Sequence, residues 1–328
     1  MARARIARDV PIVFIGTPDF AVPALRRLVS AGHEVSAVFT QPDRPAGRGR
    51  RPTPPPVKLA AEELGLPLYQ PPTLRDLEVV ELLRSLAPEA MVGVAYGQLI
   101  RPEVLAIPPR GILNLHPSLL PRWRGASPVT AAILAGDEET GITLIQMNEG
   151  LDSGPIIAQR PRRISPEDTT GTLSSALAED GATLLAAMLP RWLAGEIEPA
   201  PQDEALATVC RQLRKSDGLM DWREPAAVIW RQVRAYNPWP GAHSSLDGET
   251  MSFWRAWPLA TASGELPGTA VAAPADLPAE AAGAAIAVQT GSGLLAVLEA
   301  QRAGKRVLPS AELLRGMPGL IGRRFGAG

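Results

Sequence analysis

An amide, an imidazole and a carboxylate stand at positions of this sequence where they could act on one substrate. Asn114 and His116 lie two residues apart at the end of an apolar segment, 112–115, that is typical of a buried strand. Side chains two apart in a strand point to the same side of the sheet. A loop about one strand later supplies Asp152. We therefore expect the three groups at the edge where open α/β sheets bind ligands.

These three side chains suit the transfer of an acyl group without a metal ion or a covalent intermediate. Asn114 can donate a hydrogen bond to a developing oxyanion. His116 can donate as well or move a proton, and Asp152 can orient the imidazole and relay the proton of an attacking amine. Spacing alone leaves a structural interpretation open, because polar residues commonly end strands and Asp152 before Ser153-Gly154 could simply build a turn.

The first half of the chain alternates strand-like and helix-like segments, which would position these side chains. Apolar runs separated by amphipathic stretches indicate an α/β domain with a Rossmann-like, doubly wound and mostly parallel sheet. A long helical region follows at 172–193, which Pro190 is expected to kink or divide. The predicted strands occupy residues 11–15, 35–39, 90–95, 112–115 and 142–147.

The pattern changes after a polar, proline-containing stretch. Short β-like segments at 242–246, 251–257, 284–289 and 293–300 predict a smaller, OB-like β-barrel. The Ala/Pro/Gly-rich interval 261–283 predicts a long loop. Five tryptophans are expected to pack the core of this second domain: Trp222, Trp230, Trp239, Trp254 and Trp257. The predicted division is a catalytic domain at 8–195 with a basic loop at 41–58, a linker at 196–212 and a C-terminal domain at 213–328.

Composition removes several classes of protein. The 328 residues are 45% apolar and 20% charged, as expected for a globular chain of two domains. One cysteine and three scattered histidines exclude a disulfide scaffold and offer no local metal-binding spacing, so we expect no metal. No apolar run is long enough to span a membrane, and the N-terminus lacks an apolar secretory segment. The Gly16-Thr-Pro-Asp turn lacks the G-x-G-x-x-G pattern, which argues against dinucleotide binding.

Several motifs, in this order, resemble the 10-formyltetrahydrofolate-dependent formyltransferase family. The block after the candidate strand reads Asn114-Leu-His-Pro-Ser-Leu-Leu-Pro-Arg-Trp-Arg-Gly-Ala-Ser-Pro128, and Gly150-Leu-Asp-Ser-Gly154 follows it. Further similar segments extend the resemblance over essentially the whole chain: Phe14–Ala21, Phe39–Gly49, Val94–Gly97 and Asn237–Pro240. Pro117 is the main departure, since some relatives have a small residue there. It stiffens the loop and removes one N–H donor.

The resemblance implies two substrates and a set of site residues. The family takes its formyl group from 10-formyltetrahydrofolate, and the members most similar to this chain transfer it to the α-amino group of methionine on initiator tRNA. Asn114, His116 and Asp152 match the catalytic positions. The expected folate-binding residues are Ser118, Leu119, Leu120, Pro121, Val94, Ala95, Tyr96 and Gly97. We expect a monomer in a bacterial-type cytoplasm.

Positive charge is concentrated locally although the formal net charge is only −1. Residues 1–51 carry a net +5 and residues 209–328 a net +3, so the middle carries −9. Five cations fall within fifteen residues that include no acid: Arg44, Arg48, Arg50, Arg51 and Lys58. Such groups bind phosphates and stack on bases. The resemblance assigns this loop to the acceptor stem of the tRNA, with Arg48 as the most important position. Further candidates for tRNA contact are Arg211, Arg214 and Lys215.

Three alternatives stay open on sequence grounds. A formyltransferase acting on an amino-sugar nucleotide could share the three catalytic side chains and even a C-terminal barrel, although a small acceptor would not require the long basic loop. A noncatalytic tRNA- or folate-binding protein is opposed by the presence of all three side chains. Hydrolysis that releases formate could accompany transfer as a side activity.

Overall fold

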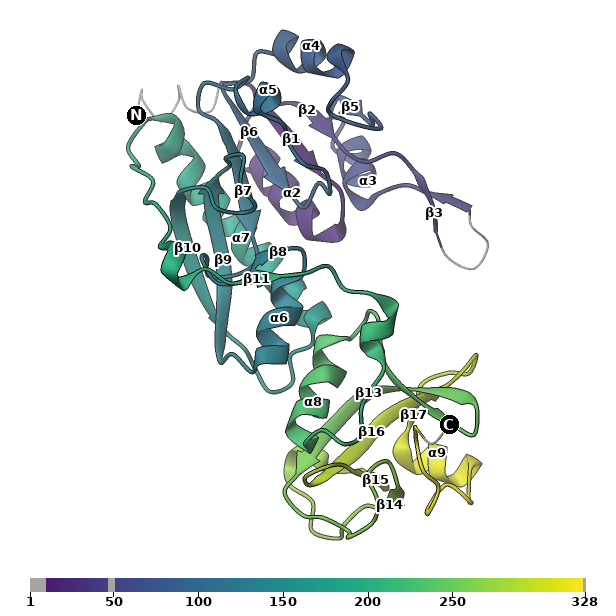
Figure 1. Cartoon of the computed structure of the whole chain (residues 1–328). Helices are drawn as coiled ribbons and strands as arrows, with labels where there is room; N and C mark the ends of the chain where they lie inside the picture. Colours follow the sequence, from purple (N-terminus) through teal and green to yellow (C-terminus); the bar gives the residue numbers. More distant parts are fainter. Residues whose placement is uncertain (1–9, 47–50, 327–328) are drawn as a thin grey trace. The chain divides into compact units, whose positions relative to one another are not determined.

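The computed structural model describes residues 10–46 and 51–326, and their contacts divide into two compact units (Figure 1). Unit 1 takes in the described residues of Met1–Pro128, Glu139–Arg163 and Ser174–Cys210. Unit 2 takes in those of Val129–Glu138, Ile164–Leu173 and Arg211–Gly328. The contacts thus assign residues 196–210, within the predicted linker, to unit 1. The predicted domain boundaries stay a prediction.

Unit 1 contains a seven-stranded sheet in the order β10-β9-β7-β6-β1-β2-β5. The last five of these strands are parallel, whereas β9 runs antiparallel to both β7 and β10. All five predicted strands lie in this sheet, and the predicted α/β fold class is confirmed. The strands are β1 (Ile12–Gly16), β2 (Val35–Phe39), β5 (Leu68–Tyr69), β6 (Ala90–Val94), β7 (Ile112–His116), β9 (Glu139–Gln146) and β10 (Ile156–Arg163).

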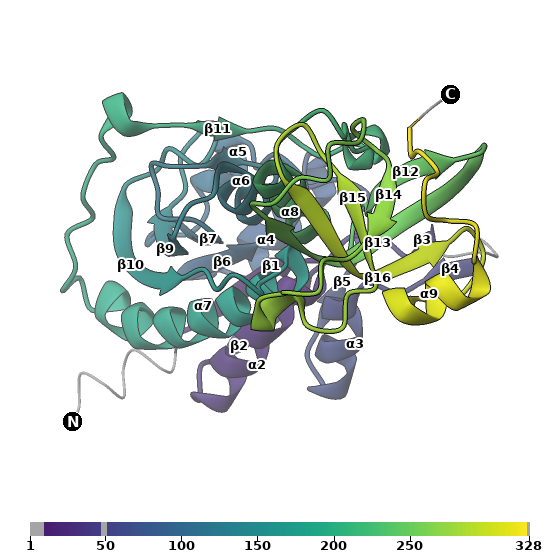
Figure 2. The same ribbon diagram turned by 90° about the horizontal axis from the view of Figure 1, so that it is seen from below.

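Helices cover both faces of this sheet (Figure 2). One face packs on α2 (Val22–Ser30), α3 (Pro56–Glu63) and α7 (Thr170–Leu193), and the other on α4 (Leu77–Ser85) and α5 (Pro102–Leu105). In α2, Ala24 and Leu25 each lie about one helical turn before Leu28, and all three are fully buried. Pro190 does not divide α7, which continues as one helix to Leu193. The sheet is therefore doubly wound, and because the helices pack on its faces, the ends of its strands can hold a functional site.

Short elements complete unit 1 and its boundary with unit 2. β3 (Arg44–Ala46) and β4 (Arg51–Thr53) form a hairpin, and β8 (Arg124–Gly125) pairs in parallel with β11 (Val209–Cys210). The last pairing ties residues 209–210 to the candidate catalytic block. The remaining elements of unit 1 are η1 (Asp19–Ala21) and η2 (Glu204–Leu206), whereas α6 (Pro128–Ala135) belongs to unit 2 from Val129 on.

Unit 2 is built on an antiparallel sheet in the order β12-β13-β16-β15-β14, with β17 paired to β16, which curls into a half-barrel. Its strands are β12 (Ala242–Leu246), β13 (Glu249–Leu259), β14 (Ala270–Ala272), β15 (Ile286–Gln289), β16 (Leu294–Arg302) and β17 (Leu308–Pro309). Its helices are α8 (Ala226–Ala235) and α9 (Ser310–Gly316), with short turns η3 (Lys215–Gly218) and η4 (Ala279–Ala281).

Two expectations for this second domain are wrong in detail. The interval 261–283 is not one loop, because it contains β14, which pairs with β15, and the turn η4. Trp222 packs in the core against Phe253 and Phe325, as predicted, but Trp239 is 53% exposed and does not. Alanine-rich segments are poor strand formers by propensity, so the pairing of β14 is set by tertiary contacts.

Candidate active site

Asn114 and His116 lie at the carboxyl end of β7, in the middle of the unit 1 sheet. Asn114 is partly exposed, and its side-chain amide forms no hydrogen bond within the described residues. His116 is 4% exposed. Leu113 and Leu115, which alternate with them, are buried in the core against α2 and α7. The alternation of the strand therefore sends the two polar side chains to the opposite face, as predicted.

The imidazole of His116 lies between a backbone carbonyl and the Asp152 carboxylate. Its Nε2 is 2.8 Å from the carbonyl oxygen of Trp123, and its Nδ1 is 3.6 Å from Oδ2 of Asp152. A carbonyl oxygen only accepts, so Nε2 carries the hydrogen and the neutral ring turns the Nδ1 lone pair toward the carboxylate. Two acceptors thus face each other across a gap that is too long for a direct hydrogen bond.

Burial sets the protonation of the His116 imidazole. It lowers the pKa of the His116 imidazole below its ordinary value, while the Asp152 charge and the Trp123 carbonyl act in the opposite direction. At neutral pH the ring is therefore neutral, and the gap between Nδ1 and Oδ2 is ready to take up a proton. A group that releases a proton, such as an attacking amine, fits the electrostatics of this gap.

Asp152 is held in an unusual backbone conformation in the loop from β9 to β10. Its φ angle is +48°, and its Oδ2 accepts a hydrogen bond of 2.9 Å from the backbone N–H of Gly125. Gly125 has φ +110°, and a Cβ atom there would run into the carbonyl oxygen of Cys210. Gly125 stands within the motif at 114–128, but no role was predicted for it. The glycine itself was the signal that the backbone comes close to another chain segment.

The predicted folate-binding residues differ in how much surface they offer. Ser118 is fully buried, and its hydroxyl donates to the carbonyl oxygen of Arg122 at 2.6 Å. Leu120 is 3% exposed, and its N–H donates to the Thr143 hydroxyl. Leu119 and Pro121 keep partly exposed side chains. In this segment the surface that a ligand could touch therefore belongs to Leu119 and Pro121.

In the second predicted folate segment, 94–97, two residues are likewise buried and two are exposed. Val94 lies within β6 and Tyr96 is 5% exposed, and burial raises the pKa of the Tyr96 hydroxyl to about 12. Ala95 and Gly97 are exposed, and both have positive φ angles, +47° and +84°. The hydroxyl of Thr17, after β1, donates to the Tyr96 carbonyl at 3.0 Å. This bond ties together the loops that follow β1 and β6 at the same edge of the sheet.

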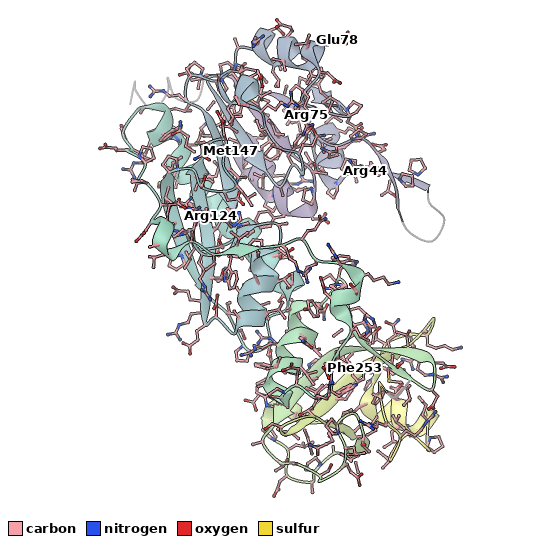
Figure 3. All side chains as sticks on the ribbon, in the orientation of Figure 1. Arg44, Arg75, Glu78, Arg124, Met147 and Phe253 are labelled. Atoms are coloured by element: carbon pink, nitrogen blue, oxygen red, sulfur yellow. The ribbon has the colours of Figure 1, made fainter. Side chains whose placement is uncertain are left out.

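The base of the basic loop is fixed by contacts within unit 1. Lys58 Nζ lies 2.9 Å from both carboxylate oxygens of Asp43, and Arg44 donates to the Gln41 side chain at 2.9 Å. Hydrogen bonds from Gln70 and Lys58 hold the pKa of Asp43 below its ordinary value. Figure 3 shows Arg44 at the start of the hairpin. Arg48 and Arg50 lie outside the described residues, and of Arg51 only the backbone is described.

The three candidates near residue 211 belong to unit 2. Arg211 forms an ion pair with Asp217 at 2.7 Å, and its side chain remains 66% exposed. Arg214 and Lys215 are exposed as well. The structure thus brings His116 and Asp152 into contact beside Asn114, whereas these three cations stand in the other unit. Within the described residues no cluster of His, Cys, Asp or Glu could hold a metal ion, and no helix is long and apolar enough to cross a membrane.

This chain belongs to the formyl transferase family. Residues 10–189 match the formyl transferase domain of that family, and residues 212–318 match its C-terminal domain. The methionyl-tRNA formyltransferase of Chloroflexus aggregans is 50% identical over 307 residues, which cover 93% of this chain and 97% of the relative. That of Nitrosococcus oceani is 46% identical over 314 residues, which cover 94% and 95%.

Solved structures share the fold at lower identity. HypX from Aquifex aeolicus in complex with tetrahydrofolic acid matches with a TM-score of 0.63 at 21% identity, over 95% of this chain and 48% of HypX. This chain therefore spans about half the length of that protein. An N-formyltransferase from Helicobacter canadensis in complex with folinic acid and dTDP-3-aminofucose matches with a TM-score of 0.62 at 16% identity, over 88% of this chain and 99% of that one. Both likenesses concern the fold alone.

Proposed function

We propose that this protein transfers the formyl group of 10-formyltetrahydrofolate to the α-amino group of methionine on charged initiator tRNA. The observation that carries the proposal is the neutral, buried His116 facing the Asp152 carboxylate across 3.6 Å, on the same strand as Asn114, whose amide forms no hydrogen bond with the residues that the structure describes. The two nearly full-length relatives described above, at 46–50% identity, are named for this reaction. Their agreement selects the acceptor, which the geometry by itself does not.

The proposed reaction is direct attack of the neutral amine nitrogen on the formyl carbon. The new C–N bond forms as the carbonyl π pair moves to oxygen, and Asn114 donates a hydrogen bond to this oxyanion. The amine proton passes into the gap between Nδ1 of His116 and Oδ2 of Asp152. The oxyanion then reforms the carbonyl, and N10 of tetrahydrofolate leaves and takes up a proton from the pair. The pair ends in the state in which it began.

The tautomer of His116 limits how it can assist. Because Nε2–H is engaged by the Trp123 carbonyl, His116 can also donate to the oxyanion only from Nδ1. Nδ1 has a hydrogen to donate only after it has taken the amine proton. In this proposal proton uptake therefore precedes any stabilisation of the oxyanion by His116, whereas Asn114 can donate throughout. In this proposal Asn114 and His116 thus act on the oxyanion at different stages.

Recognition of tRNA is proposed for the basic loop, with Arg48, Arg50 and Arg51 between the anchored positions Arg44 and Lys58. The contact of Lys58 with Asp43 would have to be exchanged before Lys58 could bind a phosphate. Arg211, Arg214 and Lys215 are proposed as further phosphate contacts. Arg48→Ala should raise the KM for initiator tRNA and leave the KM for the folate unchanged. Equal changes in both would remove the loop from tRNA recognition.

The proposal places the reaction in the cytoplasm, where charged tRNA is used, and assigns it to a monomer. The pair of His116 and Asp152 forms within one chain, so the proposed chemistry does not require a second subunit. Sedimentation at micromolar concentration tests this point. A stable dimer whose dissociation abolishes activity would contradict it.

One experiment with three separate acceptors tests which of them the protein formylates. Purified protein is given 10-formyltetrahydrofolate with charged initiator tRNA, charged elongator methionyl-tRNA or an amino-sugar nucleotide, and formylated product is measured in each case. We expect product from initiator tRNA at the highest kcat/KM. Preference for the sugar nucleotide would establish the alternative function instead. Release of formate without formylated product in any arm would point to a hydrolase.

A further inference from the structure

A segment of the predicted linker contacts the loop that holds Asp152. Gln202 donates both hydrogens of its side-chain amide to that loop, one to the Asp152 carbonyl and one to the Gly154 carbonyl, each at 2.7 Å. An amide nitrogen has two hydrogens, so its donor capacity is fully used. Gln202 therefore fastens the backbone on both sides of Ser153. Nothing in the local sequence of a proline-containing linker indicates such a contact.

Arg124 in turn orients the amide of Gln202. Its Nε and Nη2 donate to Oε1 of Gln202 at 3.0 and 2.8 Å, and its guanidinium also pairs with Glu204 at 2.7 Å. The Arg124 side chain is only 9% exposed, whereas that of Glu204 is 71% exposed. Figure 3 shows Arg124 within the strand region of unit 1. A guanidinium is purely a donor, so it forces Oε1 of Gln202 toward itself and both amide hydrogens toward the loop.

The residues on either side of Arg124 contact the two members of the proton-accepting pair. The carbonyl of Trp123 takes the Nε2 hydrogen of His116, and the N–H of Gly125 donates to the Asp152 carboxylate. The backbone at 123–125 thus fixes the orientation of the His116 ring and of the Asp152 side chain. Gln202 fixes the backbone of Asp152 through separate hydrogen bonds. All these residues lie in unit 1.

The backbone of Asp152 requires such support. A φ angle of +48° is uncommon for residues other than glycine, although aspartate adopts it more readily than most, and it persists when the surroundings fix it. Two hydrogen bonds from one oriented amide supply such support here. Without them the loop can relax toward negative φ, and the carboxylate then moves relative to Nδ1 of His116.

We infer that Gln202 is a positioning residue for the Asp152 carboxylate, and that Arg124 aligns Gln202 for this task. This inference rests on the proposed function for its kinetic part, since it assumes that the His116–Asp152 pair moves the amine proton. Its structural part is independent of the acceptor. Displacements of about 1 Å at a reacting group commonly cost up to ~10²-fold in rate.

The kinetic test compares Gln202→Ala with Gln301→Ala. The side chain of Gln301 also donates to a carbonyl, that of Lys305, and accepts from a side chain, Trp254, but it lies in β16. We expect Gln202→Ala to lower kcat by about 10- to 100-fold with both KM values within about twofold. Gln301→Ala should keep the wild-type kcat. A Gln202→Ala enzyme with unchanged kcat overturns the inference.

A double variant separates positioning from general damage. If Gln202 acts through Asp152, adding Gln202→Ala to Asp152→Asn should lower kcat no further, because the placed carboxylate is already gone. An additional loss equal to that of the single variant would assign Gln202 a purely structural role and overturn the inference. Gln202→Glu serves as a second variant if the alanine variant does not fold. It keeps the length of the side chain and sets a carboxylate against two carbonyls, and it should lower kcat in the same way.

A spectroscopic readout keeps this test separate from that of the proposed function. The ¹⁵N resonances of the His116 imidazole, followed by NMR without substrate, report the field of the Asp152 carboxylate at Nδ1. We expect Gln202→Ala to shift the Nδ1 resonance and its titration, and Gln301→Ala to leave both unchanged. If wild-type protein does not formylate charged initiator tRNA but the shift is seen, the proposed function fails and the positioning role stands. An unshifted resonance overturns the positioning role.

Discussion

Replacement of Asn114 by alanine should separate catalysis from stability. The Asn114 amide lies at the carboxyl end of β7, is partly exposed and makes no side-chain hydrogen bond within the described residues. Its removal breaks no side-chain hydrogen bond among the described residues, so the free energy of unfolding should change by less than about 0.5 kcal/mol. If the amide donates to the oxyanion, loss of one such donor should lower kcat by about 10²–10³-fold, equivalent to about 2.7–4 kcal/mol.

The assay is steady-state formylation of charged initiator tRNA with each substrate varied in turn, and urea unfolding is measured on the same preparation. Both KM values should stay near those of the wild type, because the oxyanion exists only along the reaction path. Asn114→Asp provides the companion variant, since it keeps the size but sets a negative charge toward the oxyanion, and it should be at least as slow. A kcat of Asn114→Ala within threefold of wild type would refute the oxyanion role. A rate loss matched by an equal loss of stability would also refute it.

Three further changes test other parts of the structure. Because burial lowers the pKa of His116, the unfolded chain takes up a proton first as the pH falls below about 6.5, so the free energy of unfolding should fall with pH in that range; a His116→Ala variant with the same slope would contradict this. In Lys58→Ala, the slope of log tRNA affinity against log salt should match that of the wild type, because Lys58 pairs with Asp43; a slope smaller by roughly 0.7–0.9 would instead assign it to a phosphate. Gly154→Ala should destabilise the protein by about 1–3 kcal/mol in urea unfolding, since its Cβ would run into the carbonyl oxygen of Gln146; unchanged stability would show that the loop can move aside.

The sequence predicted the parallel sheet well because its strands are apolar runs that are bounded by turn residues. Residues 35–39 and 112–115 are recognisable without knowledge of their neighbours, and both lie in the sheet at those positions. The strand Ala270–Ala272 was missed because two of its three residues are alanine, and its pairing with β15 comes from distant residues. Trp239 was placed in the core by its size, yet its position between two prolines leaves it 53% exposed. Both failures concern contacts that no local pattern encodes.

In the candidate site, too, some contacts could be predicted from the sequence and others could not. Asn114 and His116 could be paired from their spacing, because the period of a strand fixes which side chains share a face. Asp152 was placed with them because its loop follows a nearby strand, and the family resemblance strengthened this prediction. Its contact with Gly125 rests on a positive φ that the sequence only suggests. Gln202 lies 50 residues beyond Asp152, and only the fold reveals their hydrogen bond. A glutamine in a polar linker resembles any solvated residue until its acceptors are known.

The basic loop shows why summed charge is a poor guide to a binding surface. The window from Arg44 to Lys58 contains no acid, but Asp43, one residue before it, lies against the Lys58 ammonium, and Gln41 engages Arg44. A paired cation contributes less to the attraction of a distant phosphate than a free one. The same contacts, however, fix both ends of the loop. Contacts that fix Lys58 and Arg44 before binding reduce the conformational entropy lost on binding, so Asp43 can favour recognition without touching the ligand.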